Sequence, residues 1–191
     1  MTFTLSAAAL PAFKSGLTNL RHCMNKAAAN AEARGFSADA FVPLRLAPDM
    51  LTFASQIRIA CDSAKNGTAR LGGLEAPKFA DDETTFAQLQ DRIEKTLSWL
   101  ATIAPTALDG RETQEVTFPI GKNKTKTMAA DAYLTQHALP NFYFHLVTAY
   151  NLLRQAGVPL GKADYLMGAG TGPCRPRLPG ALRRGGWRSE A

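Results

Sequence analysis

Apolar residues recur at the spacing of an amphipathic helix in four separate segments of the chain. In the first, they are separated alternately by three and four positions from Leu10 to Ala31, and Gly35 is a natural C-terminal stop. Pro11 is tolerable in such a helix only near its first turn. Each stripe must bury against another element, so this pattern constrains the fold more than any other feature.

The second and third stripes have their own start signals. The second follows Pro48, which suits a first helical position, and it ends at a Gly-Gly pair. The third begins where Thr85 and Gln88 have the spacing of a capping box. The apolar positions are Met50, Ala54, Ile57, Cys61, Ala64 and Leu71 in the second stripe, and Phe86, Leu89, Ile93, Leu97 and Leu100 in the third.

The fourth helical segment covers roughly 130–156, with Gly157 as its stop. Pro140 lies inside this run, where it removes a backbone donor. The helix is therefore expected either to kink there or to split in two. A kink is favoured, because Leu139 would be a poor N-cap for a new helix.

A different pattern separates the third and fourth helical segments. Val116, Phe118 and Ile120 alternate with other residues, and a Gly-Lys-Asn-Lys sequence then offers a turn before 125–128. We expect a short β-hairpin, with Pro119 confining its strand to an edge. Its lysines could form a phosphate-binding tip, but solubilising charge on an exposed edge is the better interpretation; they are Lys122, Lys124 and Lys126.

Together these patterns predict an all-α fold, an antiparallel four-helix bundle with a short hairpin between helices three and four. An apolar fraction of 46% with 20% charged residues is ordinary for a soluble globular protein. No stretch approaches the roughly 18 apolar residues of a membrane helix, so no membrane partner is expected. With no basic leader and three cysteines far apart, the sequence indicates a cytoplasmic protein with buried thiols.

The formal charge of +6 is distributed unevenly along the 191 residues. Five Arg and one Glu lie in residues 168–191, so this stretch carries +4 and residues 1–167 carry +2. We therefore expect a bundle domain over 1–167, a Gly/Pro/Arg-rich tail over 168–191, and no nucleic-acid partner. The tail resembles a GC-rich gene read out of frame, and one hypothesis is that it is non-native.

The three histidines fall at different places on the helical stripes. His22 projects about 200° from its apolar neighbours and is expected to face solvent. His137 lies beside the fourth stripe and is expected to be a boundary residue, although it could reach the core near Pro140. His145 lies on the stripe itself, either as a buried imidazole bonded to a neighbouring helix or as a metal ligand, with the first favoured.

Two amides complete a candidate site around His145. Asn141 lies one helical turn earlier on nearly the same face, and Gln56 lies at the edge of the inward face of the second helix. Asp49 and Asp62 could join them only if that helix rotated. Neutral amides are poor zinc ligands, so a small polar ligand, a weakly held ion or a structural network fits this set better.

Three phrases of the sequence resemble a bacterial family filed as a domain of unknown function within the DinB-like superfamily of four-helix bundles. They are Arg45-Leu46-Ala47-Pro48-Asp49-Met50, Ala138-Leu139-Pro140-Asn141-Phe142-Tyr143-Phe144-His145 and Gly157-Val158-Pro159-Leu160-Gly161-Lys162-Ala163-Asp164-Tyr165-Leu166. The resemblance extends over about residues 3–167. It implies the DinB-like fold and a superfamily in which dimers occur.

The resemblance also implies a set of ligand positions. Metal-binding members of the superfamily hold a divalent ion with one His on helix two and an H-x-x-x-H pair on the last bundle helix, and some relatives transfer small thiols. In this sequence His145 matches the second histidine of the pair, Asn141 stands at the first, and Gln56 falls at the helix-two position. Two of the three ligands are replaced.

Three hypotheses for function follow. The first is an uncharacterised bundle protein that binds a small ligand in a cleft lined by Gln56, Asn141 and His145, with His137 as a further candidate. The second is a hydrolase or small-thiol transferase in which His145 and a carboxylate hold Zn, Ni or Mn. The third is a homodimeric structural or interaction protein.

Overall fold

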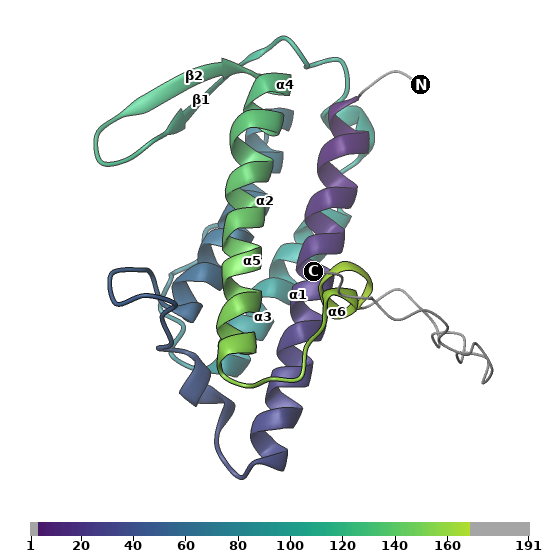
Figure 1. Ribbon diagram of the computed structural model, residues 1–191. Helices are drawn as coiled ribbons and strands as arrows, with labels where there is room; N and C mark the ends of the chain where they lie inside the picture. The colour runs from purple at the N-terminus through teal and green to yellow at the C-terminus, as the bar shows by residue number, and fades with distance from the viewer. Residues whose placement is uncertain (1–3, 169–191) are drawn as a thin grey trace, which may run out of the picture.

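The computed structural model describes residues 4–168. Four long helical segments, α1 (Leu5–Ala33), α2 (Phe53–Gly72), α3 (Phe86–Ala101) and α5 (Leu139–Gln155), pack as a bundle around one hydrophobic core (Figure 1). The predicted all-α bundle with a hairpin is therefore confirmed. The expected tail falls almost wholly on residues 169–191, which lie outside the described residues.

The four helices do not all alternate in direction. Arg21 of α1 contacts Glu94 of α3, and Asn25 contacts Gln90, so these two helices are antiparallel. By contrast, Phe53 stacks on Phe86 and Asp62 bonds to Arg92, which makes α2 and α3 parallel. The segment 74–85 returns the chain along the bundle between them, and an antiparallel arrangement holds for α1–α3 and α2–α5.

Side-chain caps set where the first two helices begin, and here two expectations were wrong. α2 begins at Phe53 rather than at Pro48, because Thr52 Oγ1 accepts a hydrogen bond from the Ser55 amide (3.3 Å). α1 begins at Leu5, so Pro11 lies beyond the first turn. Ala7 and Pro11 are both exposed, and solvent can reach the carbonyl that Pro11 leaves without a donor.

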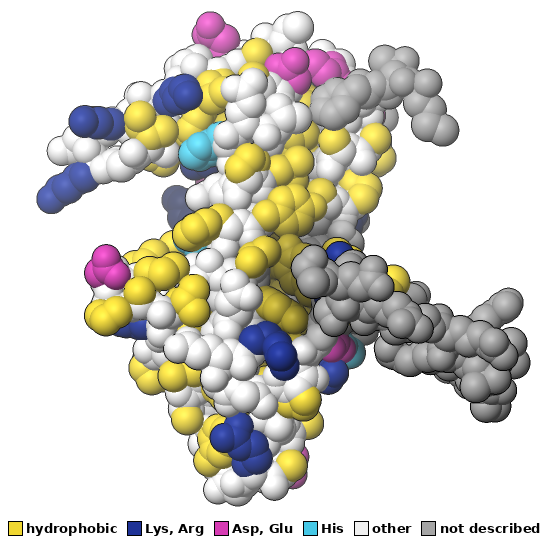
Figure 2. Space-filling model, in the orientation of Figure 1, with side chains coloured by type: hydrophobic (Ala, Val, Ile, Leu, Met, Phe, Trp, Pro, Cys, Tyr) yellow, Lys and Arg dark blue, Asp and Glu magenta, His cyan; other side chains and the backbone are white. Residues whose placement is uncertain are grey.

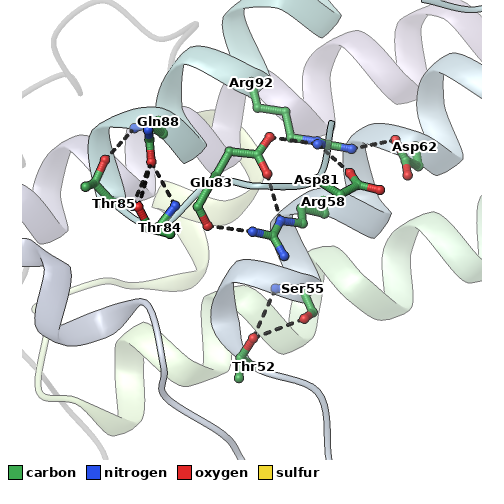
Figure 3. A network of polar contacts seen from close by, with 10 residues as sticks. All are labelled: Thr52, Ser55, Arg58, Asp62, Asp81, Glu83, Thr84, Thr85, Gln88 and Arg92. Carbon is green, nitrogen blue, oxygen red and sulfur yellow. Dashed lines mark hydrogen bonds and ion pairs between the residues drawn. The ribbon is translucent and has the colours of Figure 1, made fainter. Parts of the chain in front are cut away.

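The predicted capping box of α3 is present. The backbone N–H of Gln88 donates to Thr85 Oγ1 (3.3 Å), and the side-chain oxygen Gln88 Oε1 accepts from the backbone N–H groups of Thr84 and Thr85 (2.8 and 3.0 Å) (Figure 3).

The last bundle helix passes Pro140 without a break. A short helix α4 (Ala130–Tyr133) runs into a π-helical segment η3 (Leu134–Ala138), and α5 follows directly, so the run does not split. Hydrogen bonds of the π type skip one residue more than those of an α-helix. The wider turn lies immediately before Pro140, where the ring and the missing N–H would disturb an ideal helix.

The hairpin forms as predicted and extends from the upper end of the bundle in Figure 1. Strands β1 (Glu115–Pro119) and β2 (Thr125–Ala129) pair antiparallel, with Val116 opposite Met128 and Pro119 opposite Thr125 at the end of the ladder. Phe118 is buried against the bundle. Lys122, Lys124 and Lys126 are all exposed, and Figure 2 shows cationic side chains along this arm.

A buried arginine ties the 74–85 segment to α2 and α3 (Figure 3). The Arg92 guanidinium contacts Asp62 (2.8 Å), Asp81 (2.7 Å) and Glu83 (2.7 Å), and Glu83 also accepts from Arg58 Nε (2.7 Å). The guanidinium carbon of Arg92 also lies 4.8 Å from the centroid of the Phe79 ring, at the distance of a cation–π contact. The pKa of Glu83 is lowered, because its bonds to Arg92 and Arg58 outweigh its burial.

A short C-terminal helix, α6 (Lys162–Met167), lies against α1. Asp164 accepts from the Gly161 amide (2.7 Å), from His22 Nε2 (2.9 Å) and from Lys26 Nζ (3.0 Å). These bonds lower the pKa of Asp164 to about 2 despite its partial burial. His22 lies at the surface as expected, with its side chain 31% exposed, but α6 partly covers it and supplies Asp164 as a partner from a distant part of the sequence.

Candidate functional site between helices two and five

The centre of the predicted site is a hydrogen bond between α2 and α5. His145 is 8% exposed and Gln56 is 1% exposed, and His145 Nδ1 lies 2.7 Å from Gln56 Oε1. The favoured expectation for His145, a buried imidazole bonded to a neighbouring helix, is confirmed. Gln56 is more deeply buried than its predicted position at the edge of the inward face.

The Gln56 side chain fixes the tautomer of His145. Its Nε2 donates to the carbonyl oxygen of Leu51 (3.2 Å), and an amide nitrogen can only donate. Gln56 Oε1 must then face the imidazole, so His145 Nδ1 carries the proton and donates it. The lone pair of the ring is therefore at Nε2.

Burial keeps this ring neutral. Desolvation is the cause that lowers the pKa of His145 below its ordinary value, and no carboxylate opposes it. Among the described residues, nothing donates a hydrogen bond to His145 Nε2. His145 is thus a neutral imidazole whose Nδ1 donates to Gln56 and whose Nε2 can accept a hydrogen bond.

Asn141 forms a second link between the same helices. Its Nδ2 donates to Ser63 Oγ (2.7 Å), whereas its Oδ1 has no donor among the residues described. Ser63 lies seven residues after Gln56, two turns along α2, and that spacing is the signal by which it could have been found. We call Gln56, Ser63, Asn141 and His145 the α2–α5 cluster.

The other predicted site residues lie elsewhere. His137 packs its ring against Phe118 (centroids 4.3 Å apart) and Tyr133 (5.8 Å), beneath the hairpin. Its pKa is lowered by burial and by the nearby cations Arg70 and Lys126. Asp49 precedes α2 and is exposed, whereas Asp62 pairs with Arg92 and Lys65. The structure therefore brings neither carboxylate to His145.

These donors do not fit the divalent ion that the superfamily resemblance implies. The α2–α5 cluster offers one imidazole, two amides and one hydroxyl, whereas transition metals in proteins prefer several imidazole, thiolate or carboxylate ligands. Within residues 4–168, no three His, Cys, Asp or Glu side chains converge as a metal-binding group.

The molecular surface is hollowed beside these two helices. In Figure 2 the molecule narrows between the hairpin and the segment that precedes α2, both of which project to the same side in Figure 1. A bundle with one long crossover, a hairpin before its last long helix and a polar cluster between α2 and α5 belongs to the class of DinB-like helical bundles.

Comparisons with known proteins define the family. The family described as domain of unknown function DUF1993 matches residues 5–166, and the chain belongs to it. The chain is also similar to a solved DinB family member protein from Shewanella denitrificans, with 36% sequence identity and a TM-score of 0.79, over 92% of this chain and 96% of that one. No curated protein matches. None of the helices among residues 4–168 is long and apolar enough to cross a membrane.

Proposed function

We propose that the protein binds a small polar molecule at the α2–α5 cluster, with His145 Nε2 as a hydrogen-bond acceptor and without a metal ion. The observation that carries this proposal is the Gln56–His145 bond of 2.7 Å, which holds the proton at Nδ1. A buried polar group normally has its hydrogen-bonding capacity met by the protein. Nε2 keeps a lone pair without a protein donor between two packed helices and is not among the fully enclosed unpaired atoms of the described residues, which suits recognition of a small molecule.

The chemistry of the acceptors indicates the class of ligand. His145 Nε2 and Asn141 Oδ1 both accept, and they come from residues one turn apart on α5. Residues at this spacing have Cβ atoms about 6 Å apart. A neutral molecule with two hydroxyl or N–H donors at a similar separation matches them. An anionic ligand is disfavoured, because the α2–α5 cluster offers it two hydrogen-bond acceptors and no cationic side chain.

Nitrogen NMR of the His145 ring tests this binding directly. The probe is resorcinol, a small ring with two O–H donors, and the matched control is its dimethyl ether, which has none. We expect resorcinol to give a saturable shift of the Nε2 resonance and the ether to give none. His145→Phe should abolish the binding, whereas His137→Phe should retain it. No saturable shift with resorcinol would contradict the proposal.

Metal titration tests the alternative of a metal-dependent enzyme. Protein without a histidine tag is titrated with zinc, nickel and manganese by calorimetry. We expect no stoichiometric binding at micromolar concentration, because the cluster supplies one strong ligand. Stoichiometric binding that is lost in His145→Ala and kept in His137→Ala would overturn the metal-free assignment.

A homodimer is a second proposal, supported by apolar side chains on the outer face of α5. Tyr143, Phe144 and Val147 are 39%, 57% and 40% exposed, and Figure 2 shows apolar patches on this face. Light scattering should give twice the monomer mass. Phe144→Asp should restore the monomer, whereas Leu74→Asp, at a similarly exposed leucine elsewhere, should not. A monomeric wild type would overturn this proposal.

A further inference from the structure

A small pocket between α1, α5 and α6 contains a buried amide that no protein group satisfies. Asn19 of α1 is 8% exposed and lines this pocket of about 100 Å³. Its side-chain nitrogen and oxygen make no hydrogen bond to another described residue, and they are not among the fully enclosed unpaired atoms of the fold, so solvent reaches them through the pocket. A mostly buried amide that faces a pocket and has no protein partner can exchange its bound water for the polar group of a ligand.

The remaining polar groups of the pocket are hydroxyls. Tyr143 of α5 and Tyr165 of α6 both line it, and their hydroxyls have no partner among the described residues. The pKa of Tyr165 is raised by its burial and then by the proximity of Tyr143, so the Tyr165 hydroxyl keeps its proton and can donate near neutral pH. Ser15 adds a hydroxyl at the edge.

Tyr165 separates this pocket from a second, apolar one. The second pocket has a volume of about 210 Å³ and is lined by Val147, Tyr150, Asn151, Lys162 and Tyr165. Tyr150 packs edge-on against Tyr165 with ring centroids 5.6 Å apart. The bonds of Asp164 to His22 and Lys26 hold α6 in place. One wall is thus shared by a polar pocket and an apolar pocket.

We propose that this pair of pockets is a second ligand site, which takes a primary carboxamide head at Asn19 and an apolar body beside Tyr150. A planar amide offers one donor and one acceptor, so it satisfies both functions of Asn19. A carboxylate offers no donor to Asn19 Oδ1. The volume of about 100 Å³ is smaller than the 150 Å³ cavity that holds a benzene ring, so the head is a small group rather than a ring.

This site is separate from the α2–α5 cluster. Asn19 lies on α1 and Tyr165 on α6, and neither residue contacts Gln56 or His145 by a hydrogen bond. The inference therefore stands whether or not a ligand binds at His145.

Titration of the full chain with a matched pair of probes tests the site. Hydrocinnamamide carries a primary carboxamide on a short chain that ends in a phenyl ring. Benzylacetone has the same shape with a methyl group in place of the NH₂. Amide NMR of the protein should show saturable hydrocinnamamide binding at Asn19 and Tyr165, at least tenfold tighter than binding of benzylacetone. Equal affinity for the two probes, or no binding of either, would overturn the proposal.

Variants separate the polar head site from the apolar one. Asn19→Leu keeps the size of the side chain and should weaken hydrocinnamamide binding at least tenfold, whereas Asn25→Leu on the exposed side of the same helix should leave it unchanged. Tyr165→Phe keeps the ring and should weaken it severalfold. Light scattering checks that all variants have the mass of the wild type. Unchanged binding in folded Asn19→Leu would overturn the assignment of Asn19.

Discussion

The two sides of α2 carry buried polar groups of different kinds. On the side facing α3, Arg92 contacts three carboxylates, and Figure 3 shows them converging on it from α2 and from the 74–85 segment. On the side facing α5, His145 makes one bond to Gln56 and keeps a free acceptor. Several ion pairs mark Arg92 as a group that holds the fold together, even though its buried Nε has no hydrogen-bond partner among the described residues. An acceptor without a donor marks His145 as a group available to a ligand.

The largest expected effect comes from removing Arg92. Arg92→Met leaves Glu83 and Asp62 without their main cation and frees the 74–85 segment. Breaking a buried ion pair from one side costs about 3–5 kcal/mol, and urea unfolding followed by circular dichroism should show a loss of this size. Arg21→Met is the control, because the Arg21–Glu94 pair is partly exposed and such pairs contribute about 0–1 kcal/mol. A loss below 1 kcal/mol at Arg92 would remove the contrast between the two sides of α2.

A smaller loss is expected from Gln56→Leu. The substitution leaves the buried N–H of His145 without an acceptor, which costs about 1–3 kcal/mol. Gln90→Leu removes an exposed hydrogen bond to Asn25 and should change stability by less than about 0.5 kcal/mol. Nitrogen NMR should also show that the ring of His145 loses its single tautomer in Gln56→Leu. A ring that keeps the proton at Nδ1 in this variant would show that Gln56 does not control it.

The pH dependence of stability sharpens the same contrast. The pKa of His145 is lower in the folded chain than in the unfolded chain, so the unfolded chain binds more protons. The folded state is fully favoured above the unfolded pKa of about 6.5 and loses stability as the pH falls through it toward the lower folded pKa. His137 has a shift in the same direction. Urea unfolding should show that the free energy of unfolding falls less between pH 7.5 and 5.5 in His145→Phe than in the wild type, and less again when His137→Phe is added. The same pH dependence in wild type and variants would contradict a lowered pKa of these histidines in the folded chain.

The helices and the cluster differ in how far the sequence determines them. Helical periodicity is local, so the stripes, the capping box of Thr85 and the hairpin at Phe118 were predictable. The start of α2 was not, because Pro48 and Thr52 both carry start signals and the Thr52 cap prevails. The parallel direction of α3 depends on how the 74–85 segment folds back, and that depends on the contacts of Arg92 rather than on a local pattern.

Contacts between residues far apart in the sequence limit how much of each site can be predicted from the sequence. Gln56 and His145 both fall on inward faces, and their bond follows once α2 and α5 are neighbours. The bond of His22 was not predictable because its partner, Asp164, lies 142 residues away on α6. Asn19 was missed because it is off the main stripe of α1. It lies three residues after Gly16 and four before Cys23, and this second line at helical spacing could have indicated a second buried face.

The smallest expected effect has the opposite sign. Asn19→Leu removes a mostly buried amide that has no hydrogen bond to another described residue, and a fully enclosed group of this kind would cost about 1–3 kcal/mol. Because Asn19 keeps 8% exposure, we expect a gain near the lower limit, about 1 kcal/mol in urea unfolding. Asn25→Leu, at an exposed position of the same helix, measures the contribution of helix propensity, a few tenths of a kcal/mol, together with the loss of its exposed hydrogen bond from Gln90. A gain in stability would group Asn19 with His145, as a polar side chain whose hydrogen-bonding capacity the protein leaves open. If Asn19→Leu were instead less stable than Asn25→Leu, the Asn19 amide would be bonded within the fold and would resemble Arg92.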